Sequence, residues 1–359
     1  MKKQWIIYGI AIIALVVVVL VFRSRIHFDW RVFGEQLKQA DLKKVAVGIG
    51  LIYAAYVVRA FRWALFVKPT RKVSAFALLG TQVMGFSAVA LLGRPADLVR
   101  PYLVSRKLKL PLSSQLAVWV VERMFDLAAM ALIFSAVMLL ARNEHLPHPE
   151  LLKRTALSGL VLTFAMAVFT VVIRISGNAV AATAHGVLKP ISATFADSVA
   201  DKIRAFRNGL DTLRTTADVA FAFGLSMAMW CFITGAYLET TRAFVASPQL
   251  ASMTLARCMV LMAASMVAST VQLPIIGWFT SIGVAAATMG SFFGVAPEPA
   301  LGCGAMLLIV TFLSVVPVGL IWAQFEHVSL RKVSEESEHA VEEPGEPAVP
   351  AAEPLIVSE

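Results

Sequence analysis

The sequence predicts an all-α fold, a polytopic integral membrane helix bundle of about eight spans in which one or two segments are interrupted or re-entrant. Hydrophobic residues make up 58% of the 359-residue chain and charged residues 15%, whereas soluble proteins carry about 25% charged residues. The mean hydropathy is +0.75. Runs of roughly 20 apolar residues, the length that crosses a bilayer, recur along nearly the whole chain.

Eight apolar runs are long enough to span, at 5–22, 45–67, 73–92, 113–141, 155–175, 218–240, 256–274 and 301–324. A ninth run at 275–295 is Gly-rich and is either a full span or a re-entrant one. The first run follows Lys2 and Lys3, as a signal peptide would, but no small-x-small cleavage site follows its apolar core. We therefore expect a retained membrane anchor.

Two domains are predicted, a transmembrane region over 1–330 and a disordered acidic tail over 331–359. Residues 333–359 hold eight Glu and no Lys or Arg, and such a composition cannot bury enough apolar surface to fold. Without those eight, the remaining chain carries 32 basic and 15 acidic residues, a net charge of +17. The basic residues are scattered between spans, which favours anionic lipid headgroups as partners and argues against nucleic acid.

Residues 176–217 form the longest segment between spans and are predicted to be a cytoplasmic amphipathic segment. An apolar stripe at helical spacing is interleaved with basic residues; its members are Ile191, Phe195, Val199, Ile203, Phe206, Leu210 and Leu213. The alternative is a cytoplasmic extension of the following span. If every run crosses the membrane, the N-terminus lies outside. If the 73–92 run enters the membrane and returns to the same side, the N-terminus lies in the cytoplasm, which the polar turn after this run favours.

A polar turn interrupts the apolar pattern at Gly93-Arg94-Pro95. Pro95 is suited to the first position of a new helix, which places Asp97 in its first turn. Arg94 and Arg100 flank this carboxylate, and two cations beside a helix N-terminus suit a phosphate headgroup. The alternative is a surface loop whose arginines extend to the membrane interface.

Three ionised residues lie inside the 113–141 run, where they face hydrocarbon unless they point into the bundle. Arg123 and Asp126 are three residues apart and Glu122 and Asp126 four apart, so all three can share one helix face. We expect an Arg123–Asp126 ion pair with a surplus carboxylate that pairs with Arg94 or Arg100. The network serves either structure alone or the movement of substrate or protons.

Two further groups stand near the ends of apolar runs. Arg59, Arg62 and Trp63 resemble the aromatic and basic collar that anchors a span at the interface, which is the favoured interpretation. Pro274 and Gly277 interrupt the late apolar region, and interruptions in both halves of a chain indicate a transporter site. Close helix packing at small residues is the alternative.

No motif for enzymatic chemistry accompanies these residues. The sequence has no P-loop, no H-E-x-x-H and no G-x-S-x-G. His145 and His148 flank a proline without the spacing of a metal site. We therefore expect no catalytic activity, no cofactor and no metal.

Together these motifs resemble the lysylphosphatidylglycerol synthase transmembrane-region, or flippase-like, family. The resemblance is carried by the Arg-x-x-Arg-Trp group, the Gly-Arg-x-Ala-Asp-x-x-Arg turn, the Glu-Arg-x-x-Asp span and a late Leu-Pro before a Gly-rich run. It covers nearly the whole chain up to Trp322. Where that family has an Arg-Glu pair after the late glycines, this chain has Val284, Ala285 and Ala286 after Gly283.

The resemblance implies the lipid-handling half without the aminoacyl-transfer domain. It implies a multi-pass protein of the bacterial cytoplasmic (inner) membrane that flips an anionic phospholipid or a polyprenyl-phosphate-linked amphiphile. With no P-loop, movement would be downhill or ion-coupled. The alternative is a non-catalytic partner that presents a lipid to a separate glycosyl- or aminoacyl-transferase; an enzyme using Asp97 or Glu122 as base ranks last.

Overall fold

The computed structural model describes residues 29–141, 146, 148–210, 215–269 and 276–342. All regular elements in these ranges are helices. The first predicted span and the last part of the acidic tail lie outside the described residues, as does Pro274.

Within the described residues, six helical stretches are long and apolar enough to cross a membrane, which confirms the polytopic bundle. They are α3 (Leu42–Val67), α4 (Ala75–Leu92), α6 (Leu112–Leu140), α7 (Pro149–Leu188), α9 (Thr216–Arg242) and the stretch Pro297–Phe325. The last consists of α13 (Pro297–Leu308), the π-helical turn η3 (Ile309–Leu313) and α14 (Val315–Phe325). Each overlaps a run predicted from hydropathy, because a 20-residue apolar stretch can satisfy its backbone in lipid only as a helix.

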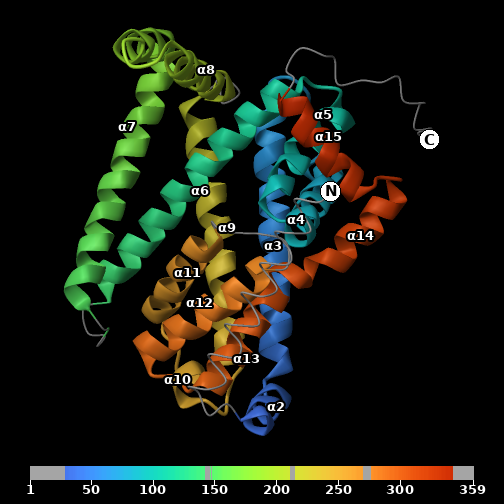
Figure 1. Cartoon of the computed structure of the whole chain (residues 1–359), viewed down its shortest axis with the longest axis vertical. Coiled ribbons are helices and arrows are strands. Elements are labelled where there is room, and N and C mark those ends of the chain that lie inside the picture. The colour runs from blue at the N-terminus through green and yellow to red at the C-terminus, as the bar shows by residue number, and fades with distance from the viewer. Residues whose placement is uncertain (1–28, 142–145, 147, 211–214, 270–275, 343–359) are drawn as a thin grey trace.

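The helices α3 and α9 form an antiparallel pair at the centre of the bundle (Figure 1). At one end Lys44 Nζ donates to the carbonyl of Arg242 at 3.2 Å, and further along Arg59 Nη2 contacts Met229 Sδ at 3.1 Å. The C-terminal ends of α3 and α9 therefore lie at different ends of the bundle. Two short helices, α2 (Trp30–Lys38) and α10 (Pro248–Ala251), lie at the α9 C-terminal end.

We call α4, the 3₁₀ turn η1 (Arg94–Leu98) and α5 (Val99–Leu108) the N-terminal hairpin. Gly93 turns the chain with φ of 82°, a left-handed value that suits glycine. The chain then returns to the end of the bundle from which it came. There Arg71 Nη1, just beyond α3, donates to the carbonyl of Leu108 at the end of α5, at 2.7 Å. Both ends of this hairpin thus lie at the C-terminal end of α3, as the re-entrant alternative for the 73–92 run predicts.

We call α11 (Leu255–Ala268) and α12 (Ile276–Phe293) the C-terminal hairpin. Arg242 Nε at the end of α9 donates to the carbonyl of Met253 at 2.9 Å, just before α11. The Arg257 guanidinium lies 6.0 Å from the Phe293 ring, so the start of α11 and the end of α12 are neighbours. This hairpin opens at the opposite end of the bundle from the N-terminal hairpin.

The two hairpins touch inside the bundle. Trp278 Nε1 near the start of α12 donates to the carbonyl of Ala90 near the end of α4, at 2.9 Å. Two helical hairpins that enter from opposite ends and meet are the arrangement expected when both halves of a chain carry an interrupted segment.

The 176–217 segment divides between two elements. Its first part continues α7, with a kink at Ser176 where φ is −128° and ψ is 22°. The helix α8 (Ala193–Leu210) then lies across the end of α7 and against α6 (Figure 1). This orientation agrees with an interfacial helix and not with an extension of α9, which begins separately with a capping box at Thr215 and Asp218.

The predicted boundary of a disordered tail at 331 is wrong. A helix, α15 (Leu330–Glu342), packs on the N-terminal hairpin. Leu330 and Val333 are buried against it, and Glu336 Oε2 accepts from Tyr102 Oη at 2.9 Å. The composition from 333 onwards conceals this helix, because its few apolar residues all fall on one face.

Candidate functional site

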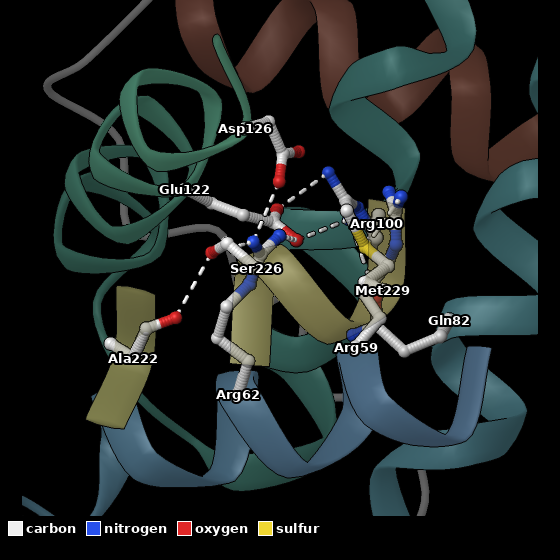
Figure 2. Close-up of polar contacts among 9 residues, drawn as sticks. All are labelled: Arg59, Arg62, Gln82, Arg100, Glu122, Asp126, Ala222, Ser226 and Met229. Atoms are coloured by element: carbon white, nitrogen blue, oxygen red, sulfur yellow. Dashed lines mark hydrogen bonds and ion pairs between the residues drawn. The ribbon is translucent and has the colours of Figure 1, made fainter. Parts of the chain in front are cut away.

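Two carboxylates on α6, one helical turn apart, face the same guanidinium on α3. Arg62 Nη2 donates to Glu122 Oε1 and Arg62 Nη1 to Asp126 Oδ1, each at 2.6 Å. Arg62 Nη1 also contacts Ser226 Oγ of α9 at 2.5 Å. The Arg62 and Glu122 side chains are 1% exposed. Figure 2 shows these groups from α3, α6 and α9 converging at one point.

A second guanidinium reaches Glu122 from α5 of the N-terminal hairpin. Arg100 Nη2 lies 2.8 Å from Glu122 Oε2, and its Nη1 donates to Glu122 Oε1 at 3.1 Å. The approach depends on Gly85 of α4, since a Cβ at this position would lie 2.7 Å from Arg100 Cβ. The expected partner for a surplus carboxylate on α6 is confirmed as Arg100.

Arg59 lies in the same region, but no carboxylate among the described residues forms an ion pair with it. Its Nη2 contacts Met229 Sδ at 3.1 Å, and its guanidinium lies 4.3 Å from the centre of the Phe86 ring. Nη1 is buried, and no acceptor for it lies in the part of the chain that the structure describes. The guanidinium of Arg100 lies 5.0 Å from the same ring, so the two cations lie against one aromatic side chain.

The favoured interpretation of Arg59 and Arg62 as an interfacial collar is wrong. Both are buried in the bundle, and only the later basic residues of that region reach the end of α3. Trp63 is buried too, and its Nε1 donates to Gln115 Oε1 at 3.1 Å.

The expected Arg123–Asp126 ion pair is also wrong. Arg62 holds Asp126, while the Arg123 guanidinium lies 5.9 Å from the Trp119 ring one turn earlier on α6. Arg123 Nε and Nη2 are buried, and none of the described residues provides an acceptor for them. Its charge still interacts with both carboxylates. The helical spacing allowed Arg123 and Asp126 to pair, but an arginine on a neighbouring helix binds the carboxylate instead.

The buried network therefore carries more positive than negative charge. Its described members comprise four guanidinium groups and two carboxylates. Arg59, Arg62, Arg100, Glu122 and Asp126 are buried, and Arg123 is half-buried, with its Nε and Nη2 shielded from solvent. The formal surplus is two positive charges. Isolated charges in a low-dielectric interior are costly, so a surplus of cations creates a demand for an anion.

The remaining predicted site residues lie around this network. Asp97 on η1 is half-buried, and its charge interacts with Arg100 and Arg123. As expected, Pro95 stands at the start of a new helix and Asp97 in its first turn; this turn is 3₁₀ and leads directly into α5. The Arg94 side chain and all of Pro274 lie outside the described residues. Gly277 is buried near the start of α12, beside Trp278.

Sequence reasoning missed several polar and aromatic members of the site. Gln82 of α4 is fully buried and lies 3.4 Å from Arg100 Nη1 through its Oε1. An amide within an 18-residue apolar run is a detectable signal of the same kind as a charge. Ser226 and Met229 had no such signal, because serine and methionine are ordinary residues of membrane helices.

A cleft of about 320 Å³ lies outside the network. Residues of α4, α14 and the start of α15 line it, including Leu91, Leu320, Ala323, Val328 and Leu330. Its lining is mainly apolar, with Gln324, Ser329 and Arg331 at the α14–α15 end.

Fold and site together define a class of protein, a polytopic helical membrane protein with two opposed hairpins around a buried, basic network. The chain belongs to the family described as the lysylphosphatidylglycerol synthase TM region, whose model matches residues 6–319. This confirms the resemblance and identifies a multi-pass membrane protein of a lipid-handling family. No curated protein matches the chain, and no solved structure does.

Proposed function

We propose that this protein moves an anionic amphiphile, such as a phospholipid or a polyprenyl-phosphate-linked lipid, between the two leaflets of a membrane. The surplus of buried guanidinium groups is the observation that supports the proposal. Donors of Arg59 and Arg123 have no acceptor among the described residues, and a phosphate headgroup supplies both acceptors and negative charge.

The opposed hairpins supply the route. Each hairpin opens at one end of the bundle, and they meet at the Trp278–Ala90 hydrogen bond. In this proposal small movements of the hairpins about that contact expose the network to one side of the membrane and then to the other. Arg100 moves with the N-terminal hairpin, whereas Arg59 and Arg62 stay on α3.

Roles within the network follow from the contacts. Both terminal nitrogens of Arg62 are engaged, by Glu122, Asp126 and Ser226, and these contacts hold α3, α6 and α9 together. Glu122 holds Arg100 in place. The protein carries out no covalent chemistry in this account, and its cytoplasmic (inner) membrane location in a bacterium belongs to the proposal.

Reconstitution of the purified protein into liposomes tests the proposal. We expect fluorescently labelled phosphatidic acid or phosphatidylglycerol to redistribute between leaflets faster than in protein-free liposomes. A protein that moves no lipid alone, but is required by a separate transferase, would instead be a partner that presents lipid substrate.

A further inference from the structure

The number of unneutralised cations in the network specifies the charge of its ligand. We propose that the site binds a headgroup bearing a phosphate monoester dianion, with Arg59 and Gln82 as its direct contacts. This inference rests on the proposed function and narrows its substrate class.

Arg62 is not available to a ligand. Three of its contacts to oxygen are 2.6 Å or shorter, and they involve both carboxylates and a serine. Arg100 is engaged by Glu122 through both of its terminal nitrogens. A ligand that displaced either arginine would leave a buried carboxylate unpaired, which is strongly unfavourable.

Arg59 is available, because it has no carboxylate partner among the described residues. It is 7% exposed, and its contacts are a sulfur atom and an aromatic ring, which provide weak acceptors at most. Its Nη1 therefore keeps the capacity to donate to a ligand oxygen.

Gln82 adds a second donor at the same place. Its Oε1 faces Arg100 Nη1, which fixes the orientation of the amide and leaves Nε2 buried with no acceptor among the residues that the structure describes. Gln82 and Phe86 are one turn apart on α4, and Arg59 lies against Phe86. Figure 2 shows the Arg59 and Gln82 side chains close together beside Arg100.

The six charged groups of the network give it a formal charge of +2. Asp97 on η1 is half-buried, so water screens its charge, whereas Nε and Nη2 of Arg123 are shielded from solvent. A phosphate monoester, with a second pKa of about 6, carries close to two negative charges above neutral pH. A phosphodiester such as phosphatidylglycerol carries one, and phosphatidylcholine carries no net charge. Of these three headgroups, only the phosphate monoester carries enough negative charge to neutralise the site.

Binding of lipids with matched dioleoyl chains to the full-length protein in detergent at pH 8 tests this inference. Fluorescence of the tryptophans gives the apparent Kd, because Trp63 lies 4.9 Å from the Arg100 guanidinium. We expect phosphatidic acid to bind at least about tenfold more tightly than phosphatidylglycerol, the ratio that corresponds to about 1.4 kcal/mol.

Two variants lower the site charge by one in different ways, Arg59→Gln by removing a cation and Gln82→Glu by adding a carboxylate. Both are expected to reduce the preference for phosphatidic acid to about twofold or less, while Arg59→Lys retains most of it. Arg331→Gln, on the exposed face of α15, is the matched control and should leave the preference unchanged. If one of the two variants fails to fold, the other still gives the result.

Each outcome decides a different point. Equal binding of phosphatidic acid and phosphatidylglycerol to the wild type would contradict the proposal that the headgroup is a dianion, and it would leave the proposed function intact. Equal binding of phosphatidylcholine would contradict both. Binding of inorganic phosphate as tight as that of phosphatidic acid would support the dianion but contradict the lipid source, and with it the proposed function. An unchanged preference in Arg59→Gln and Gln82→Glu would overturn the assigned contacts.

Discussion

Arg62 of α3 and Glu122 of α6 are sixty residues apart in sequence, yet their side chains meet at 2.6 Å inside the bundle. Arg62→Ala leaves two buried carboxylates short of a partner, and loss of one member of a buried pair costs about 3–5 kcal/mol. We expect a lower yield and a lower unfolding temperature in detergent. Arg106→Ala breaks the half-exposed pair with Glu336 and should cost about 0–1 kcal/mol. Equal stability of the two variants would contradict the buried network.

A second prediction concerns the close approach of α5 to α4. Gly85→Ala places a methyl group 2.7 Å from Arg100 Cβ and displaces the arginine from Glu122. Overpacking of this kind costs about 1–3 kcal/mol. Gly224→Ala on α9 is the control, because no atom lies within 4 Å of its added Cβ. We expect it to be neutral or to stabilise by up to about 1 kcal/mol. Thermal unfolding in detergent measures both changes.

The orientation of the bundle can be tested with cysteines at its two ends. The basic residues of α8 and those beyond α3 and α5 lie at one end, which by the positive-inside bias is cytoplasmic. In a background where exposed Cys231 is replaced by serine, Gln249→Cys of α10 should react with a membrane-impermeant maleimide in intact cells. Lys189→Cys, between α7 and α8, should react only after the cells are opened. The reverse pattern would invert the topology.

The contact of α15 with the N-terminal hairpin gives a local prediction. Glu336→Ala removes the acceptor of the Tyr102 hydroxyl and the partner of Arg106. We expect faster amide exchange over 330–342 with little change in global stability, since half-exposed pairs contribute at most about 1 kcal/mol. Glu335→Ala is the control, because Glu335 pairs only within α15, with Arg331. Exchange that rises equally in both variants would show that α15 does not depend on Glu336.

Hydropathy predicted most of the helices because the bilayer imposes a length and a composition on any span. It also indicated the N-terminal hairpin through the Gly93–Pro95 turn. The cost of an unpaired carboxylate predicted that Arg94 or Arg100 pairs with a carboxylate of α6, and in the structure Arg100 pairs with Glu122. The helix in 331–342 could not be recognised from composition, because α15 depends on packing against α5 that the sequence does not reveal.

The pairing of Arg62 could not be predicted, because it requires knowing which faces of α3, α6 and α9 meet. Arg59 and Arg62 stand near the end of an apolar run, where interfacial anchors are common. In the structure α3 continues to Val67, so Arg62 lies more than one turn inside the helix and Arg59 about two. The spacing along α6 indicated that Arg123 pairs with Asp126. This prediction failed because helix periodicity gives no information about competing partners on other helices.

The central claim is that the surplus charge of the buried network carries an anionic lipid across the membrane. The most direct test measures the initial rate at which labelled phosphatidic acid leaves the inner leaflet of liposomes containing wild type, Arg59→Gln or Arg331→Gln at equal protein density. We expect wild type and Arg331→Gln to transport at equal rates and Arg59→Gln to be slower by at least about tenfold, which corresponds to about 1.4 kcal/mol. Equal rates in all three proteins, or no transport by the wild type, would contradict the claim.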